Sequence, residues 1–207
     1  MHIAILTFEG YNELDSIIAL GVLNRIKGDD WQVTIATPTP KVTSMNGVVI
    51  EQMTTLEEAC DADAVIVGSG IATREVVEDP AIMGVLRRLD PSRQLVAVQC
   101  SGALVLARLG LLADVPACTD LTTKPWVVAA GVDVLDQPFF ARDNVATAGG
   151  CLASPYLAAW MITRLVGAEA AEDALQYVAP VGEKREYIDR AWRNVSPYLP
   201  APAPALI

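Results

Sequence analysis

The sequence predicts an α/β fold, in which a doubly wound, mostly parallel sheet is flanked by helices in a three-layer sandwich. Two observations predict it. Short runs of Val, Ile, Leu and Ala recur without polar alternation, as they do in strands whose two faces are both covered. Segments with apolar residues at helical spacing separate these runs, and strands that alternate with helices imply right-handed crossovers between parallel neighbours.

The first half of the chain supplies most of the predicted sheet. A helix is predicted over residues 13–26, and a second over residues 79–89, where an acid before a proline marks a helix start. Residues 41–53 carry short β-prone pieces around Asn46-Gly47, which indicates a hairpin. The four parallel strands are expected at residues 3–6, 33–36, 64–67 and 95–98.

The second half adds two strands and becomes helical. Residues 102–107 predict a helix that is buried nearly all round. Residues 139–148 predict two strands joined at Asp143-Asn144, and a helix over residues 152–166 precedes a more polar helical region that ends near Pro197. The whole pattern favours a flavodoxin-like arrangement of sheet and helices.

Composition favours one domain over residues 1–197, followed by a Pro/Ala-rich tail over residues 198–207. Of the 207 residues, 52% are hydrophobic and 19% are charged, which suits a sizeable core. The net charge of −10 argues against nucleic acid as a partner. No apolar run approaches the ~20 residues that span a bilayer, and no signal peptide is evident. We therefore expect a cytoplasmic protein.

The rare residue types exclude several kinds of site. The one histidine, His2, rules out multi-histidine metal centres. It begins the first predicted strand, roughly 15 Å from the carboxyl ends, where open α/β sheets bind ligands. No C-x-x-C motif occurs, so zinc ribbons and thioredoxin chemistry are not expected, and neither is a metal or an organic cofactor. The thiols are expected to stay reduced at Cys60, Cys100, Cys118 and Cys151.

Cys100 is the strongest candidate for a reactive residue. It ends a predicted strand and is followed at once by Ser101-Gly102 and a buried helix, the arrangement of a nucleophile elbow. A helix N-terminus favours thiolate over thiol, so we expect a thiol pKa below that of a free cysteine. The alternative is a buried cysteine that acts only as a small hydrophobe.

Two further features belong to the same edge of the predicted sheet. Asp15 lies on an otherwise apolar helix stripe, so its carboxyl group is expected to point inward; the alternative is that it serves only an N-cap at Asn12. Gly68-Ser69-Gly70 follows the third strand, and its backbone N–H groups suit an oxyanion hole, although such a segment also forms ordinary turns.

In combination these features resemble the ThiJ/PfpI superfamily, the cysteine branch of the class I glutamine amidotransferase-like fold, over roughly residues 2–180. Within it, the chain looks most similar to the isonitrile (isocyanide) hydratase-like branch. The resemblance is carried by Phe8 with Leu14-Asp15, by residues 98–106, by Gly110-Leu111-Leu112, by Arg142-Asp143 and by residues 147–153.

The resemblance implies a role for each matching residue. Cys100 corresponds to the nucleophile and Asp15 to the acidic residue that contacts it. Ser69, Gly70 and Ser101 correspond to positions that form the oxyanion hole or support it. Cys151 corresponds to a residue that borders the pocket in the hydratases. The family also implies a homodimer, with a small electrophilic molecule as the substrate.

One position departs from the family pattern. Many members place a histidine twenty residues beyond the cysteine, where this chain has Asp120. A second carboxylate opposes a thiolate, because like charges do not both ionise cheaply. Asp120 is therefore expected to be turned away or paired with a base such as Lys124, or the Cys100 thiol is less acidic than its counterparts. A Cys-His mechanism is not available.

The expected activity is conversion of an isonitrile to an N-formamide. The Cys100 thiolate attacks the terminal carbon to give a thioimidate, and Asp15 relays the protons. Amides of the predicted oxyanion positions stabilise the negative charge. Candidates for the pocket wall are Tyr11, Ile71, Trp126 and Cys151. Two alternatives stay open: a cofactor-free glyoxalase or deglycase-like enzyme, and a non-enzymatic sensor of oxidation or of a ligand.

Overall fold

Within residues 1–200, which the computed structural model describes, six strands form one sheet in the order β2-β1-β5-β6-β8-β7. The first five strands of this order are parallel, and β7 runs antiparallel to β8. The predicted sheet is confirmed. Its strands are β1 (His2–Leu6), β2 (Gln32–Ala36), β5 (Ala64–Val67), β6 (Leu95–Gln99), β7 (Phe139–Arg142) and β8 (Val145–Ala148).

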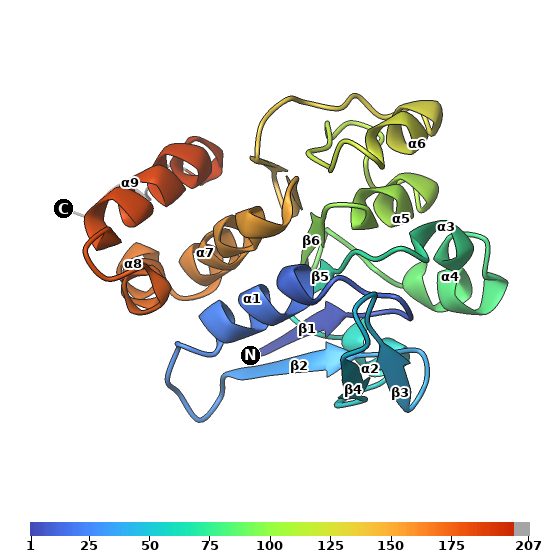
Figure 1. Ribbon diagram of the computed structural model, residues 1–207, viewed down its shortest axis with the longest axis horizontal. Coiled ribbons are helices and arrows are strands. Elements are labelled where there is room, and N and C mark those ends of the chain that lie inside the picture. Colours follow the sequence, from blue (N-terminus) through green and yellow to red (C-terminus); the bar gives the residue numbers. More distant parts are fainter. Residues whose placement is uncertain (201–207) are drawn as a thin grey trace.

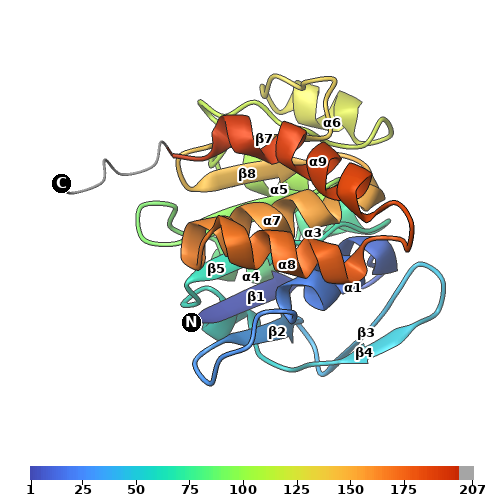
Figure 2. The ribbon, with the colours of Figure 1, turned by 90° about the vertical axis from the view of Figure 1, so that its left-hand side faces the viewer.

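Helices cover both faces of this sheet and make the predicted three-layer sandwich (Figures 1 and 2). One face carries α1 (Glu13–Leu23), α7 (Ser154–Leu165), α8 (Ala168–Val178) and α9 (Lys184–Val195). The other carries α2 (Leu56–Ala59), α3 (Thr73–Val76), α4 (Pro80–Leu86), α5 (Gly102–Arg108) and α6 (Lys124–Ala129). Short 3-10 turns are η1 (Cys151–Ala153) and η2 (Ser196–Tyr198).

The uniform apolar character of the strands follows from this layering. Alternate side chains of β1 enter different cores: Ile3 and Ile5 pack with the α1 and α7 layer, whereas Ala4 and Leu6 pack with the layer of α2, α4 and α5. All four are fully buried. A strand with two covered faces has no position for a polar side chain, which is why polar alternation is missing.

Three details differ from the sequence-based expectations. The first helix ends at Leu23 instead of continuing to residue 26, because the N–H groups of Arg25 and Ile26 bond to carbonyls only three residues back, at 3.0 and 3.3 Å, in place of the α-helical pattern. The short helices α2, α3 and α6 were not predicted. The predicted hairpin forms, but as a separate two-stranded antiparallel sheet of β3 (Lys41–Thr43) and β4 (Val49–Glu51).

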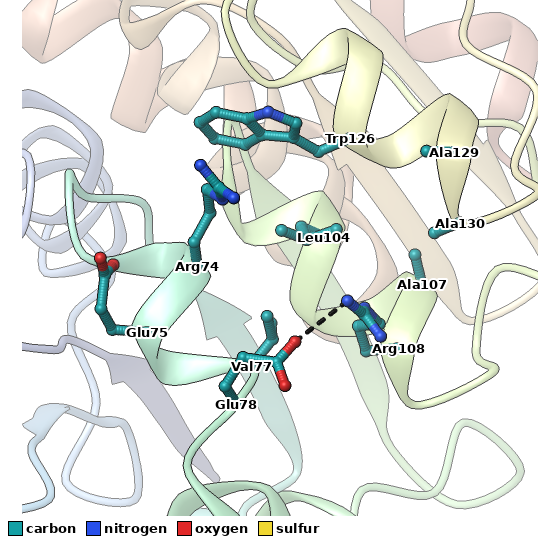
Figure 3. Close-up of a pocket in the computed structure, with 10 residues that line it drawn as sticks. All are labelled: Arg74, Glu75, Val77, Glu78, Leu104, Ala107, Arg108, Trp126, Ala129 and Ala130. Atoms are coloured by element: carbon teal, nitrogen blue, oxygen red, sulfur yellow. Dashed lines mark hydrogen bonds and ion pairs between the residues drawn. The ribbon is translucent and has the colours of Figure 1, made fainter.

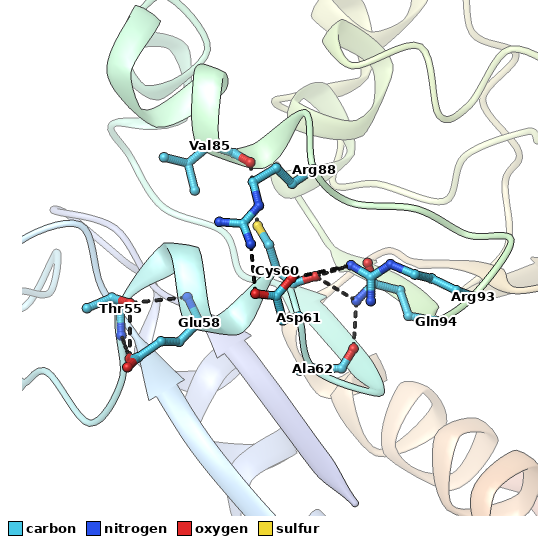
Figure 4. Close-up of polar contacts among 9 residues, drawn as sticks. All are labelled: Thr55, Glu58, Cys60, Asp61, Ala62, Val85, Arg88, Arg93 and Gln94. Atoms are coloured by element: carbon cyan, nitrogen blue, oxygen red, sulfur yellow. Dashed lines mark hydrogen bonds and ion pairs between the residues drawn. The ribbon is translucent and has the colours of Figure 1, made fainter.

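The turn between α2 and β5 is fixed by side chains from neighbouring segments (Figure 4). Arg88 pairs with Asp61 at 2.7 Å, and the buried Gln94 amide donates to the carbonyls of Ala62 at 2.7 Å and Cys60 at 3.3 Å. The Cys60 thiol faces the carbonyl of Val85 at 3.6 Å. Cys60 therefore lies at the amino end of β5, away from the carboxyl edge of the sheet.

The chain remains folded onto the sheet as far as Tyr198. Its ring packs against Phe139 and Phe140, with centroids 5.8 and 5.0 Å away, and its hydroxyl accepts a hydrogen bond from Gln137 at 2.8 Å. Residues 201–207 of the predicted tail lie outside the described residues. None of the helices in the described part of the chain combines the length and the apolar character needed to cross a membrane.

Candidate active site

Cys100 occupies the sharp turn predicted between β6 and α5. Its φ is +47°, and Asp143 in the β7–β8 turn is the one other non-glycine residue in the described part with positive φ. The Cys100 N–H donates to the Ala148 carbonyl at 2.8 Å, and its own carbonyl accepts from the Thr119 hydroxyl at 2.7 Å. A strained, firmly held residue at a strand-to-helix turn is the defining geometry of a nucleophile elbow.

Gly102 permits this turn because nothing larger fits. A Cβ atom there would lie 2.7 Å from the carbonyl oxygen of Gly68 and 2.8 Å from that of Val67. We expect Gly102→Ala to lower the free energy of unfolding by about 3 kcal/mol, the upper range for overpacking against backbone. Urea unfolding followed by circular dichroism measures the change.

Gly84 provides the matched control, because a Cβ there would meet nothing within 4 Å in helix α4. Gly84→Ala is expected to leave the free energy of unfolding unchanged or to raise it by up to about 1 kcal/mol through helix propensity. Equal effects of the Gly102 and Gly84 substitutions would contradict the close approach described here.

Asp15 points inward from α1, as predicted, and is 1% exposed. Its Oδ2 atom accepts a hydrogen bond from the Ser69 hydroxyl, whereas its Oδ1 atom has no hydrogen-bond partner among residues 1–200. A carboxylate oxygen of Asp15 and the Sγ atoms of Cys100 and Cys151 all lie within 4.8 Å of one another. Asn12 caps α1 through the Leu14 N–H at 3.1 Å, so capping does not account for the inward side chain of Asp15.

Burial dominates the electrostatics of this cluster. It raises the pKa of Asp15, and this rise is opposed by the hydrogen bond from Ser69 and by the nearby thiols of Cys100 and Cys151. Burial also raises the pKa of the Cys100 thiol, and the charge of Asp15 raises it further. The pKa of Cys151 is raised by the same two causes in the same order. Because a carboxyl group is intrinsically far more acidic than a thiol, the one negative charge that the cluster accepts resides on Asp15.

The expectation of a resting Cys100 thiolate is therefore wrong. The N-terminus of α5 does favour an anion, but a terminal dipole is worth only about 0.3–1 kcal/mol in most settings. Burial of the sulfur, which is 4% exposed at Cys100, and the adjacent Asp15 carboxylate together outweigh it. Burial and the Asp15 charge therefore favour a neutral Cys100 thiol beside a carboxylate that can take its proton.

The Gly68–Gly70 loop approaches the elbow, with one change from the predicted roles. The Gly70 N–H donates to the Ser101 hydroxyl at 3.1 Å, and the same hydroxyl bonds the Thr73 hydroxyl at 2.7 Å. The Gly70 N–H is thus not free to donate to an oxyanion. The Ser101 hydroxyl instead holds the loop in place through these hydrogen bonds. The backbone N–H groups of Ser69 and Ser101 donate no hydrogen bond within the described residues and remain available.

The Asp120 carboxyl group is engaged by backbone hydrogen bonds of its own turn. Its Oδ1 atom accepts from the N–H groups of Thr122 and Thr123, both at 2.9 Å, at the start of the segment that leads into α6. Its charge is the smallest of the influences that raise or lower the pKa of Asp15. No ion pair joins it to Lys124 in the described part; only the Lys124 backbone N–H contacts its carbonyl, at 3.0 Å.

Two residues of the site were not predicted. The Gln99 side chain donates to the Cys100 sulfur at 3.6 Å and to the Gly150 carbonyl at 2.8 Å. The Asn12 side chain donates to the Cys151 sulfur at 3.1 Å. The signal for Gln99 was present, because it is the one polar residue of the otherwise apolar β6; Asn12 gave no signal beyond helix capping.

A cavity of about 790 Å³ lies between α3, α5 and α6, and Cys100 is not among the residues that line it (Figure 3). The Arg74 guanidinium lies 5.1 Å from the ring centroid of Trp126 across it. Of the other predicted wall residues, Tyr11 is buried with its hydroxyl bonded to the Val48 carbonyl at 3.0 Å, and Ile71 is 69% exposed. Cys100 itself is almost entirely buried.

The cluster of Asp15, Cys100 and Cys151 is also the group of side chains that would suit a thiophilic cation. Such an ion needs ionised thiols. Since the pKa values of both thiols are raised, the cluster as it stands favours protons. His2 lies at the amino end of β1, where its ring bonds to Thr34 at 2.8 Å, so it does not contribute to this site.

Comparison with known proteins identifies the family. Residues 1–164 match the model of the DJ-1/PfpI family, and the chain belongs to that family. No curated protein matches the sequence. The central sheet, the helices on its two faces and the cysteine at the elbow are thus those of a DJ-1/PfpI protein.

Solved structures of this family superpose on the chain. A ThiJ/PfpI family protein from Pseudomonas syringae does so with a TM-score of 0.76 at 19% identity, over 94% of this chain and 87% of that one. DJ-1 from Schizosaccharomyces pombe gives 0.75 at 13%, over 87% and 100%. DJ-1beta from Drosophila melanogaster gives 0.71 at 22%, over 86% and 96%. At these identities the likeness concerns the fold.

Proposed function

We propose that this protein is a cysteine-dependent enzyme that hydrates isonitriles to N-formamides. The observation that carries the proposal is the isolated pair of Asp15 and Cys100: a neutral thiol beside one buried carboxylate, with no imidazole at the site. This pair suits a substrate that needs a proton added to the same carbon that the sulfur attacks.

In the first half of the reaction, the thiol proton of Cys100 moves to Asp15 and then to the substrate. The Cys100 sulfur attacks the terminal carbon of R–N≡C while Asp15 takes the thiol proton, so the S–H bond breaks as the S–C bond forms. Asp15, now neutral, returns the proton to that carbon, which gives the thioimidate R–N=CH–S. The raised pKa of Asp15 favours the first of these transfers, because it makes the carboxylate a stronger base toward the thiol proton.

Hydrolysis completes the cycle with the same residues. Water adds to the thioimidate carbon as Asp15 accepts one of its protons and passes that proton to the nitrogen, and the N–H groups of Ser69 and Ser101, which have no acceptor among the described residues, are the candidates for stabilising developing negative charge. The C–S bond then breaks as the proton of the added hydroxyl group moves to the sulfur, and R–NH–CHO leaves. The sum is isonitrile plus water to formamide.

Access to the sulfur favours an isonitrile over a 2-oxoaldehyde. Cys100 is 4% exposed, so a slender linear group that reacts at its terminal atom reaches it more easily than two adjacent carbonyl groups do. A glyoxalase must also move a proton between two neighbouring carbons, and Asp120, which stands where many relatives have a histidine, is engaged with its own turn.

The test supplies the full chain with an aryl isonitrile and, separately, with methylglyoxal. Formamide is followed by ultraviolet absorbance after chromatography, and lactate is measured enzymatically. We expect formamide above the buffer rate and no lactate. Lactate alone would reject the proposal in favour of a glyoxalase, and the absence of both products would reject both activities.

A further inference from the structure

The structure brings a second thiol to the elbow. Cys100 follows β6 and Cys151 follows β8, and these strands are neighbours in the sheet, with Gln99 paired to Ala148. The two Sγ atoms lie within 4.8 Å of each other. A disulfide needs an S–S distance of about 2.05 Å, so the two side chains must rotate toward each other to form one. Cys60 and Cys118, by contrast, are fully buried elsewhere.

We propose that Cys151 and Cys100 form a reversible dithiol–disulfide pair, in which a hydroperoxide oxidises Cys151 first and Cys100 then closes the disulfide. In the first step the Cys151 sulfur attacks the peroxide oxygen, giving Cys151 sulfenic acid and releasing water or an alcohol. In the second, the Cys100 sulfur attacks the sulfenic sulfur; the S–S bond forms, the S–OH bond breaks, and water leaves with the thiol proton.

The order of the two steps follows from exposure and hydrogen bonding. Cys151 is half-buried, whereas Cys100 is 4% exposed, so a dissolved oxidant reaches Cys151 more readily. The Asn12 amide donates to the Cys151 sulfur at 3.1 Å, which partly offsets the burial and the Asp15 charge that raise the pKa of this thiol. Asp15 lies beside both sulfurs and can accept the proton that Cys100 loses when it attacks.

This arrangement would protect the nucleophile. A sulfenic acid with no thiol nearby proceeds to sulfinic acid, which is irreversible in most settings, whereas a disulfide is restored by thiols. The inference goes beyond the proposed hydration and does not depend on it, because the pair is detected by mass and not by turnover.

The experiment exposes the full chain to hydrogen peroxide with a chelator present, blocks free thiols with iodoacetamide, and digests with trypsin. Each cysteine lies in a different tryptic peptide, with Cys100 in residues 94–108 and Cys151 in residues 143–164. We expect these two peptides to be joined, with a loss of two hydrogen masses that dithiothreitol reverses, and alkylated Cys60 and Cys118.

Two variants test the order, with dimedone as the sulfenic acid probe. Cys100→Ser is expected to carry dimedone on Cys151, and Cys151→Ser is expected to label Cys100 at least about tenfold more slowly, given its burial. Cys118→Ser, the matched control, is expected to form the same linked peptides as the wild type. Sulfinic acid at Cys100 of the wild type without linked peptides would overturn the pair, and equal labelling of the two variants would overturn the order.

Discussion

Replacing Cys100 by serine is expected to reduce formamide formation to the uncatalysed rate, a loss of about 10⁴-fold or more, as for other catalytic nucleophiles. The hydroxyl keeps the size of the thiol and its place at the elbow. It is a much weaker nucleophile, and Asp15 is too weak a base to ionise it ahead of attack. Formation of formamide, followed by ultraviolet absorbance, measures the loss.

Cys60→Ser is the control for this substitution. Cys60 is buried at the amino end of β5, far from the carboxyl edge that bears the elbow, so formamide formation is expected to stay within about twofold of the wild type. If Cys100→Ser kept more than a tenth of the wild-type rate, the sulfur would not be the nucleophile.

Replacing Asp15 by asparagine is expected to have two effects of opposite sign. The rate of formamide formation falls by about 10²- to 10⁴-fold, the contribution of a general acid–base group. The free energy of unfolding at pH 8 is expected to rise by about 1–3 kcal/mol, because the amide is neutral and burial penalises the ionised carboxyl group that it replaces. Product assays and urea unfolding measure the two quantities.

The pH dependence of the stability difference follows from the raised pKa of Asp15. The folded state binds the proton of the Asp15 carboxyl group more tightly than the unfolded chain does. The free energy of unfolding of the wild type therefore falls as the pH rises from the ordinary aspartate pKa through the raised pKa of the folded state. The gain in the free energy of unfolding from Asp15→Asn is therefore largest above the raised pKa of Asp15, and it disappears as the solution is acidified below the ordinary aspartate pKa. A difference that does not change with pH would contradict the assignment.

Glu13 gives a control on the same helix. Hydrogen bonds, chiefly from Ser44, lower the pKa of Glu13, the opposite direction to Asp15. Its carboxylate also accepts from the Asn46 amide at 2.9 Å. Glu13→Gln is expected to leave the protein no more stable than the wild type at pH 8, so a rise in stability common to both variants would point to a general effect of lost negative charge.

The sequence was sufficient where local pattern decides the structure. The unbroken apolar runs identified the parallel strands, because a strand covered on both faces admits no polar residue. The step from β6 into a buried helix identified the elbow at Cys100. The polar Asp15 on an apolar stripe identified its inward direction, because a carboxyl group there enters the layer between α1 and the sheet.

The sequence was insufficient where the outcome depends on contacts between distant segments. Whether Cys100 is ionised depends on burial and on a carboxylate that comes from α1, and the helix-dipole argument gave the wrong direction. The Gly70 N–H was taken for a free donor because the Ser101 hydroxyl that accepts from it follows a different strand. The contact of Asn12 with Cys151 joins residues 139 positions apart and leaves no local pattern.

The pH dependence of Cys100 alkylation is the most direct test of the neutral thiol beside an ionised carboxyl group. Iodoacetamide labelling of the peptide of residues 94–108 is followed by mass spectrometry from pH 5 to pH 10. In the wild type, the labelling rate is expected to rise only above the free-thiol pKa of about 8.5. In Asp15→Asn, the labelling rate is expected to rise at a lower pH than in the wild type, because the adjacent negative charge is gone. A wild-type labelling rate that already reaches its plateau below pH 7 would contradict the account.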